Sequence, residues 1–140
     1  MTRQITTIDC QTAQRVAAAV VAEATGRRVA VAVVVTDPAG EPIAVVRMDG
    51  ANAVALRLAT DKAYTAVAFG APSHHWAEAT APGGVDWGMA NAAGGRILVL
   101  PGGLPIRAGG QVVGAVGVSG AAPPVDLACA EAGCAALEAA

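Results

Sequence analysis

The sequence has 140 residues, a formal net charge of −2 and an apolar content of 54%, while charged residues make up only 14%. This length predicts a single domain over residues 1–140, large enough to bury a core without a disulfide or a metal. The net charge lacks the basic excess expected of a nucleic-acid-binding protein. No apolar run reaches the roughly 18 residues that a membrane span needs. We therefore expect no nucleic-acid partner and no membrane association.

The cysteines Cys10, Cys129 and Cys134 are odd in number and lie at no spacing typical of a metal site. This pattern favours small buried thiols in a reducing compartment. The N-terminus, Met-Thr-Arg-Gln-Ile, lacks the basic and then apolar pattern of a signal segment. We therefore expect a cytoplasmic protein. Because so little charge is available to cover the surface, we also expect a homo-oligomer with an apolar interface.

Apolar periodicity predicts four elements before residue 70: a helix over 8–25, strands over 29–36 and 42–47, and a helix over 52–69. Thr7 is the expected N-cap of the first helix, and Gly26 the expected residue after its end. The first strand is apolar on both faces, which is typical of a strand covered on both sides. Asp37-Pro38-Ala39-Gly40 predicts a type I turn into the second, antiparallel strand.

Three polar residues, Arg47, Asp49 and Lys62, stand out in this half of the chain. Arg47-Met48-Asp49-Gly50 occupies the predicted junction between strand and helix, where side chains converge on a cleft. Lys62 is the only lysine of the chain and lies in an alanine-rich helix. It is either a surface lysine whose stem covers apolar neighbours or a buried ammonium that reaches Arg47 and Asp49. The second interpretation predicts one pocket around these three residues.

Residues 70–95 are the least regular part of the sequence and contain both histidines, both tryptophans and Met89. Ser73 is the expected N-cap of a short helix that ends at Ala79. Long segments of this composition commonly cover a pocket or form an interface. Adjacent histidines point about 100° apart on a helix, so His74 and His75 are not expected to chelate one ion together. They are either ordinary surface residues or one of them acts as a ligand or base.

Residues 96–120 combine apolar strand runs with turn signals at Gly102-Gly103 and Gly109-Gly110. Gly114 and Gly117 interrupt the last run, which indicates a close approach by a packed helix or by a ligand. A helix over 126–137 follows. The order of helix, hairpin, helix, irregular segment, meander and helix predicts an α+β fold with an antiparallel sheet.

Four ordered motifs carry a resemblance to a known family. They are Arg47-Met48-Asp49-Gly50-Ala51, the Ala59/Lys62-Ala63/Thr65-Ala66/Phe69 pattern, Pro101-Gly102-Gly103-Leu104-Pro105-Ile106, and Gly114-Ala115-Val116-Gly117-Val118-Ser119-Gly120 with Asp126 and Gly133 after it. The chain resembles the GlcG/HbpS family of haem-binding or haem-degrading-like domains, which also occur at the C-terminus of some PduO-type corrinoid adenosyltransferases. The resemblance implies a profilin-like fold with a five-stranded antiparallel sheet between helices, and assembly into symmetric oligomers. It also implies haem or a related tetrapyrrole as the ligand of some members.

Two departures from the family concern the irregular segment. Where the family often has an Arg-Pro-Thr-like turn, whose threonine contacts haem iron in some members, this chain has Ala71-Pro72-Ser73. The His-His-Trp sequence that follows is particular to this chain. Both departures favour a specialised ligand.

Three classes of function remain open. The first is a binding module for haem or another small ligand. The expected ligand-binding residues are Arg47, Asp49, Lys62, Ser73, His74, Trp76, Gly102 and Gly103. The candidates for an iron ligand are His74, His75 and Met89, and those for the carboxylates of haem are Arg47 and Arg96.

The second class is a cofactor-independent enzyme of the isomerase, lyase or hydrolase type that acts on a small anionic metabolite. Its expected catalytic residues are His74, His75, Asp49 and Lys62. The third class is a scaffold protein that uses an apolar face between subunits.

Overall fold

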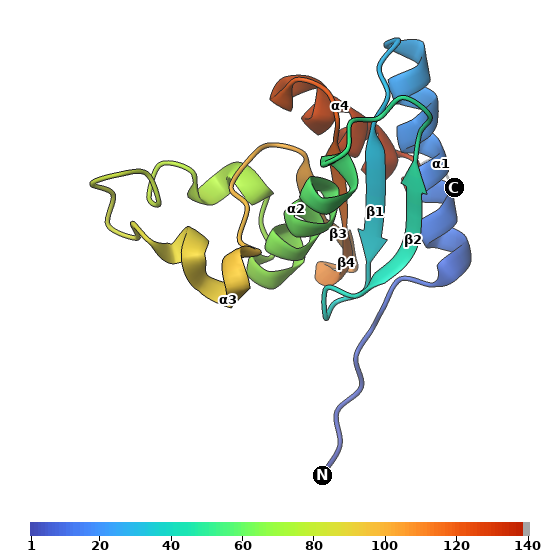
Figure 1. The fold of residues 1–140 in the computed structure, drawn as a ribbon. Coiled ribbons are helices and arrows are strands. Elements are labelled where there is room, and N and C mark those ends of the chain that lie inside the picture. The colour runs from blue at the N-terminus through green and yellow to red at the C-terminus, as the bar shows by residue number, and fades with distance from the viewer. Residues whose placement is uncertain (139–140) are drawn as a thin grey trace.

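The structure is a computed structural model that describes residues 1–138 (Figure 1). In chain order the elements are α1 (Cys10–Gly26), β1 (Ala32–Thr36), β2 (Pro42–Arg47), α2 (Ala55–Phe69), the 3₁₀ turns η1 (Ser73–Trp76) and η2 (Met89–Asn91), α3 (Ala92–Gly95), β3 (Gly103–Ala108), β4 (Gln111–Ser119) and α4 (Pro123–Ala135). The expected α+β class is confirmed. Among the described residues, no helix is both long enough and apolar enough to cross a bilayer.

The sheet is antiparallel throughout and has the strand order β2-β1-β4-β3. The described residues form four strands, so the expected five-stranded sheet is wrong. The run over 97–100 does not pair with a strand, because side chains bond its backbone instead. The Leu98 N–H donates to Thr65 Oγ1 at 2.9 Å, and the Leu100 carbonyl accepts from Ser73 Oγ at 2.5 Å.

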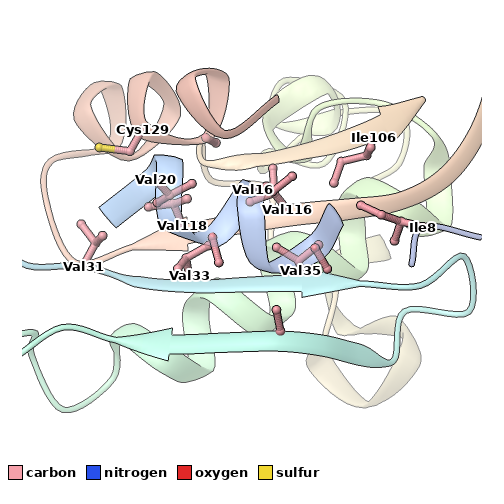
Figure 2. Close-up of a cluster of buried hydrophobic side chains, with 14 of the residues drawn as sticks. Ile8, Val16, Val20, Val31, Val33, Val35, Ile106, Val116, Val118 and Cys129 are labelled. Atoms are coloured by element: carbon pink, nitrogen blue, oxygen red, sulfur yellow. The ribbon is translucent and has the colours of Figure 1, made fainter. Parts of the chain in front are cut away.

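Helices α1 and α4 cover one face of the sheet. Figure 2 shows Val16 and Val20 of α1 close to Val116 and Val118 of β4, and all four side chains are fully buried. Burial of a valine side chain contributes roughly 1.5–3 kcal/mol. The main core therefore lies between these two helices and the sheet.

Helix α2 covers the opposite face, so β1 is covered on both sides as its two apolar faces predict. Helix α2 presents a stripe of small residues to the sheet. The helix lies close to β4 because the strand has Gly117, which has no side chain, at the point of contact. A Cβ at Gly117 would collide with the Ala59 carbonyl and approach the Ala63 backbone N–H. The helix-packing interpretation of this glycine is therefore confirmed.

Two predicted features of α1 are wrong. The N-cap is Asp9, whose Oδ1 accepts from the Thr12 N–H at 2.7 Å, and not Thr7. The N–H of Ile8 bonds to the Val113 carbonyl, which holds the chain before Asp9 against the sheet and outside the helix. Gly26 remains inside α1, and Arg28 takes the positive φ of 59° expected of the residue after the helix.

Residues 70–95, called the arm below, extend away from the sheet and its covering helices (Figure 1, green to orange). The arm leaves the end of α2 and consists mainly of turns. The predicted irregularity of this segment is confirmed. Its predicted helix is shorter, because η1 ends at Trp76, and Ser73 is not a cap since its hydroxyl bonds elsewhere.

Candidate functional site

Lys62 is buried in the interior, with 1% of its surface exposed. Its Nζ donates to Asp126 Oδ2 and to the Val118 carbonyl, each at 2.9 Å. The other carboxylate oxygen of Asp126 accepts from the Ala121 N–H at 2.9 Å. Burial lowers the pKa of Lys62, and its hydrogen bond and ion pair with Asp126 oppose that effect. The pair joins α2 to the start of α4 through hydrogen-bonded charges.

The glycine turn before β3 packs directly on this lysine. Gly102 lies beside the ammonium with φ at 123°, and a Cβ there would come within 3.0 Å of Nζ. The Gly103 N–H donates to Ser73 Oγ at 2.9 Å, and a Cβ on Gly103 would collide with the Lys62 carbonyl. The structure therefore brings together four of the predicted site residues: Lys62, Ser73, Gly102 and Gly103.

Arg47 and Asp49 do not join this group. Both residues are exposed. Arg47 is the last residue of β2, and Asp49 follows it, so both lie at one edge of the sheet. The arm begins with η1, which packs on α2 and on β3 at the opposite edge. No hydrogen bond or ion pair within residues 1–138 links either residue to Lys62. The expected Lys62–Asp49 pairing is wrong, as is the surface-lysine alternative.

Sequence reasoning missed Asp126 as the partner of Lys62. Asp126 is 2% exposed and is the acidic residue in the first turn of α4. The available signal was a carboxylate in a strongly apolar helix, where a buried charge needs a partner. Only the three-dimensional structure, in which Lys62 of α2 reaches both Val118 at the end of β4 and Asp126, shows which partner it has.

A second charged cluster, which the sequence analysis did not predict, fastens the end of the arm to α2. Asp61 accepts from Arg57 Nε at 2.9 Å and lies 3.5 Å from Arg96 Nε. The Arg96 guanidinium also lies over the Tyr64 ring, 3.8 Å from its centroid. A cation over an aromatic face contributes about 0.5–1 kcal/mol at an exposed site. Arg96 is thus held in place, and a third of its side chain is exposed.

The two histidines of the arm have different environments. His74 is half-buried, and its Nδ1 atom is buried without a hydrogen-bond partner among the described residues. His75 is exposed and lines an open groove of about 410 Å³, whose other lining residues are Glu78, Ala79, Gly83, Gly84 and Val85. The groove has a polar side at His75 and Glu78, and the rest of its lining is apolar or glycine.

The remaining arm candidates lie apart from the groove lining. Trp76 is half-buried against Phe69, with ring centroids 5.3 Å apart, and Met89 is half-buried in η2. Within the described residues, no group of three or more His, Cys, Asp or Glu side chains gathers to hold a metal ion. A larger hollow of about 660 Å³ lies against residues 3–7 and contains none of the predicted site residues.

Comparisons with known proteins agree with the resemblance in the sequence. Residues 8–135 match the family described as haem degrading protein HbpS-like. The chain belongs to the HbpS-like family. It is 36% identical to a 15.0 kDa Citrobacter freundii protein of the dhaT-dhaS intergenic region over 129 residues, which cover 92% of this chain and 91% of that protein.

Two solved structures are similar over almost the whole chain. The complex of PduOC with haem has a TM-score of 0.89 and 28% identity, and covers 93% of this chain and 94% of that one. The double mutant of Streptomyces reticuli HbpS has a TM-score of 0.88 and 33% identity, and covers 97% of this chain and 90% of that one. The family and its relation to PduO are therefore confirmed.

Proposed function

We propose that this protein binds haem or a related tetrapyrrole, and that the arm supplies the binding surface. Family membership and the similarity to a haem complex support the class of ligand. The observation that carries the proposal is the exposed imidazole of His75 beside an open groove. Imidazole is a common axial ligand of haem iron. When bound, the haem iron would supply the redox and ligand-binding chemistry.

The arm residues fit a flat, largely apolar ligand with anionic edges. Val85 and Trp87 expose 93% and 68% of their surfaces, so the arm offers apolar area that a flat ligand could cover. The groove volume falls within the roughly 300–1,000 Å³ typical of small-molecule sites. The ligand would cover the apolar surface and place its metal near an imidazole.

For the carboxylates of the ligand, we propose Arg96. Its guanidinium is partly exposed and is fixed at the base of the arm by Asp61 and Tyr64. Charge-assisted bonds from arginine to carboxylate are among the strong hydrogen bonds of proteins. Arg47, the other predicted candidate, lies at the far edge of the sheet from η1.

The alternative of a cofactor-independent enzyme gains no support from the geometry. It needs Lys62 to hold an anionic substrate, but the ammonium is buried and bonded to Asp126 and Val118. It also needs Asp49 near His74 or His75, and these residues belong to opposite edges of the fold.

Haem titration tests the proposal. Adding ferric haem to the purified protein should give a saturable new Soret band, with a dissociation constant in the micromolar range or below. Serum albumin and a buffer blank serve as controls for nonspecific uptake and for haem aggregation. A titration that matches the buffer blank at every haem concentration contradicts the proposal.

We further propose a cytoplasmic homo-oligomer. The edge strand β2 exposes Val45 and Val46, with 48% and 37% of their surfaces accessible. An exposed edge strand presents unpaired backbone N–H and C=O groups with which a strand of another chain can pair. Light scattering at micromolar concentration should give a mass that is a multiple of 13.7 kDa. A mass equal to one chain contradicts this part of the proposal.

A further inference from the structure

The two adjacent histidines of η1 are not equivalent as metal ligands. Successive residues on a 3₁₀ turn point about 120° apart. His74 is half-buried, and its Nδ1 is buried without a hydrogen-bond partner among the described residues. The His75 ring is exposed and lies on the groove. Of the two imidazoles, that of His75 is therefore the more exposed one and the one that lines the groove.

An aromatic row holds the His75 ring in place. Its ring meets that of Trp76 edge to face, with centroids 5.2 Å apart and an interplanar angle of 84°. The Trp76 ring in turn packs against Phe69 at the end of α2. Edge-to-face ring pairs are favourable beyond the area that they bury. A histidine ring that is already fixed in this way loses less conformational entropy when it binds a metal.

The groove also provides a carboxylate close to this imidazole. Glu78 follows His75 by three residues, and Ala77 between them has helical φ and ψ angles of −58° and −43°. Residues three apart on a helical turn lie on the same side. A carboxylate that accepts from the free ring N–H of a ligating histidine fixes its tautomer and raises its basicity.

The glycines of the groove leave room for a flat ligand to approach. Gly84 packs so closely that a Cβ would collide with the Ala79 carbonyl, and a Cβ at Gly83 would meet nothing within 4 Å. Val85 adds an exposed apolar surface next to these glycines. Apart from His75 and Glu78, the lining of the groove therefore consists of small or apolar residues.

We propose that His75 is the axial ligand of the haem iron in this protein, with Glu78 as the acceptor of its second ring N–H. The assignment rests on the proposed function. His74 and Met89, the other candidates from the sequence, do not line the groove. Serine replaces the threonine at the family-like turn, and Ser73 is buried and bonded to Leu100 and Gly103. Its hydroxyl is therefore engaged within the protein.

The matched pair of variants His75→Ala and His74→Ala tests the assignment. Both remove an imidazole from the same turn. We expect His75→Ala to weaken ferric haem binding at least tenfold and to shift the Soret band, and imidazole added to the buffer should restore the wild-type spectrum. His74→Ala should keep the wild-type spectrum and affinity. Circular dichroism of the haem-free variants checks that both fold.

Each outcome separates the assignment from the function. If the wild-type protein takes up no haem, the proposed function and the assignment both fail. If His75→Ala binds haem with the wild-type spectrum and affinity, the assignment fails and the function stands. Loss of the haem spectrum in His74→Ala alone would also overturn the assignment of His75.

Glu78→Gln should lower the Fe–His stretching frequency in the resonance Raman spectrum of the ferrous protein, and an unchanged frequency contradicts the role of Glu78.

Discussion

The Lys62–Asp126 pair and the arm differ in how completely their polar groups are satisfied. Around the pair, the ammonium and both carboxylate oxygens have hydrogen-bond partners, and both side chains are at most 3% exposed. On the arm, His75 is exposed and the buried Nδ1 of His74 has no partner among the described residues. Buried charges that are paired and bonded fix the positions of elements, whereas a free imidazole is available to a ligand. The lone lysine of this chain is therefore structural, and the exposed imidazole supports our proposal that the arm binds the ligand.

The largest effect that tests this comparison is on stability. Lys62→Met should lower the free energy of unfolding by about 3–5 kcal/mol, because it leaves the Asp126 carboxylate buried without its counter-ion. Urea denaturation measures this change. Arg57→Met is the matched control, since its side chain is 70% exposed and should cost less than about 1 kcal/mol. An equal decrease in the free energy of unfolding in the two variants would show that the buried pair stabilises the fold no more than an exposed one.

A smaller loss is expected where the arm joins the body. Ser73→Ala removes the hydroxyl that accepts from the Gly103 N–H and donates to the Leu100 carbonyl. Because Gly103 is buried, an unsatisfied backbone group should cost about 1–3 kcal/mol of unfolding free energy. Thermal denaturation of Ser73→Ala beside His75→Ala provides the check, since replacement of the exposed histidine should cost less than replacement of the buried serine. Unchanged stability of Ser73→Ala would mean that water replaces the hydroxyl.

The fold was largely predictable from the sequence, while the site was predictable only in part. Apolar periodicity located the helices and the hairpins, because it reports which faces are buried. The five-stranded sheet that the family resemblance implied is wrong because Thr65 and Ser73 bond the backbone of 97–100, and the motifs carry no information about such side-chain bonds. The strand-to-helix junction in the sequence suggested that Lys62 lies near Asp49. In the structure Asp49 follows β2, whereas Lys62 packs against the turn before β3, and these two strands form opposite edges of the sheet. Strand order depends on long-range packing, which a linear pattern does not encode.

The pH dependence of stability extends the comparison to Cys134, a half-buried thiol on α4. Burial raises the pKa of Cys134 from 9.0 to about 11, so the folded protein holds this proton over a range in which the unfolded chain has lost it. The folded state is therefore stabilised below pH 9, and this contribution is lost as the pH rises from about 9 to 11. We expect Cys134→Ala to remove about 1 kcal/mol of that decrease.

Differences between variants isolate this effect from other groups. Burial lowers the pKa of Lys62, so its contribution to stability increases with pH, whereas that of Cys134 decreases. Because Lys62 is present in both cysteine variants, its contribution cancels in their comparison. Urea denaturation at pH 8 and at pH 10 gives the comparison. Cys10→Ser is the control, because Cys10 is exposed. If Cys134→Ala shows the same alkaline decrease in stability as Cys10→Ser, the Cys134 thiol is not the source of that decrease.

The smallest effect on stability is expected on the arm itself. Trp87→Ser should change the free energy of unfolding by less than about 0.5 kcal/mol, because 68% of its surface is already in contact with water. The same substitution should weaken ferric haem binding several-fold, because it removes apolar surface that the proposed ligand would cover. Ile5→Ser is the matched control, since Ile5 is 61% exposed but lies in the N-terminal segment. Denaturation and haem titration of the two variants separate the outcomes. A large loss of stability in Trp87→Ser would mean that the arm packs as part of the folded body, and equal haem affinity in both variants would remove Trp87 from the binding surface.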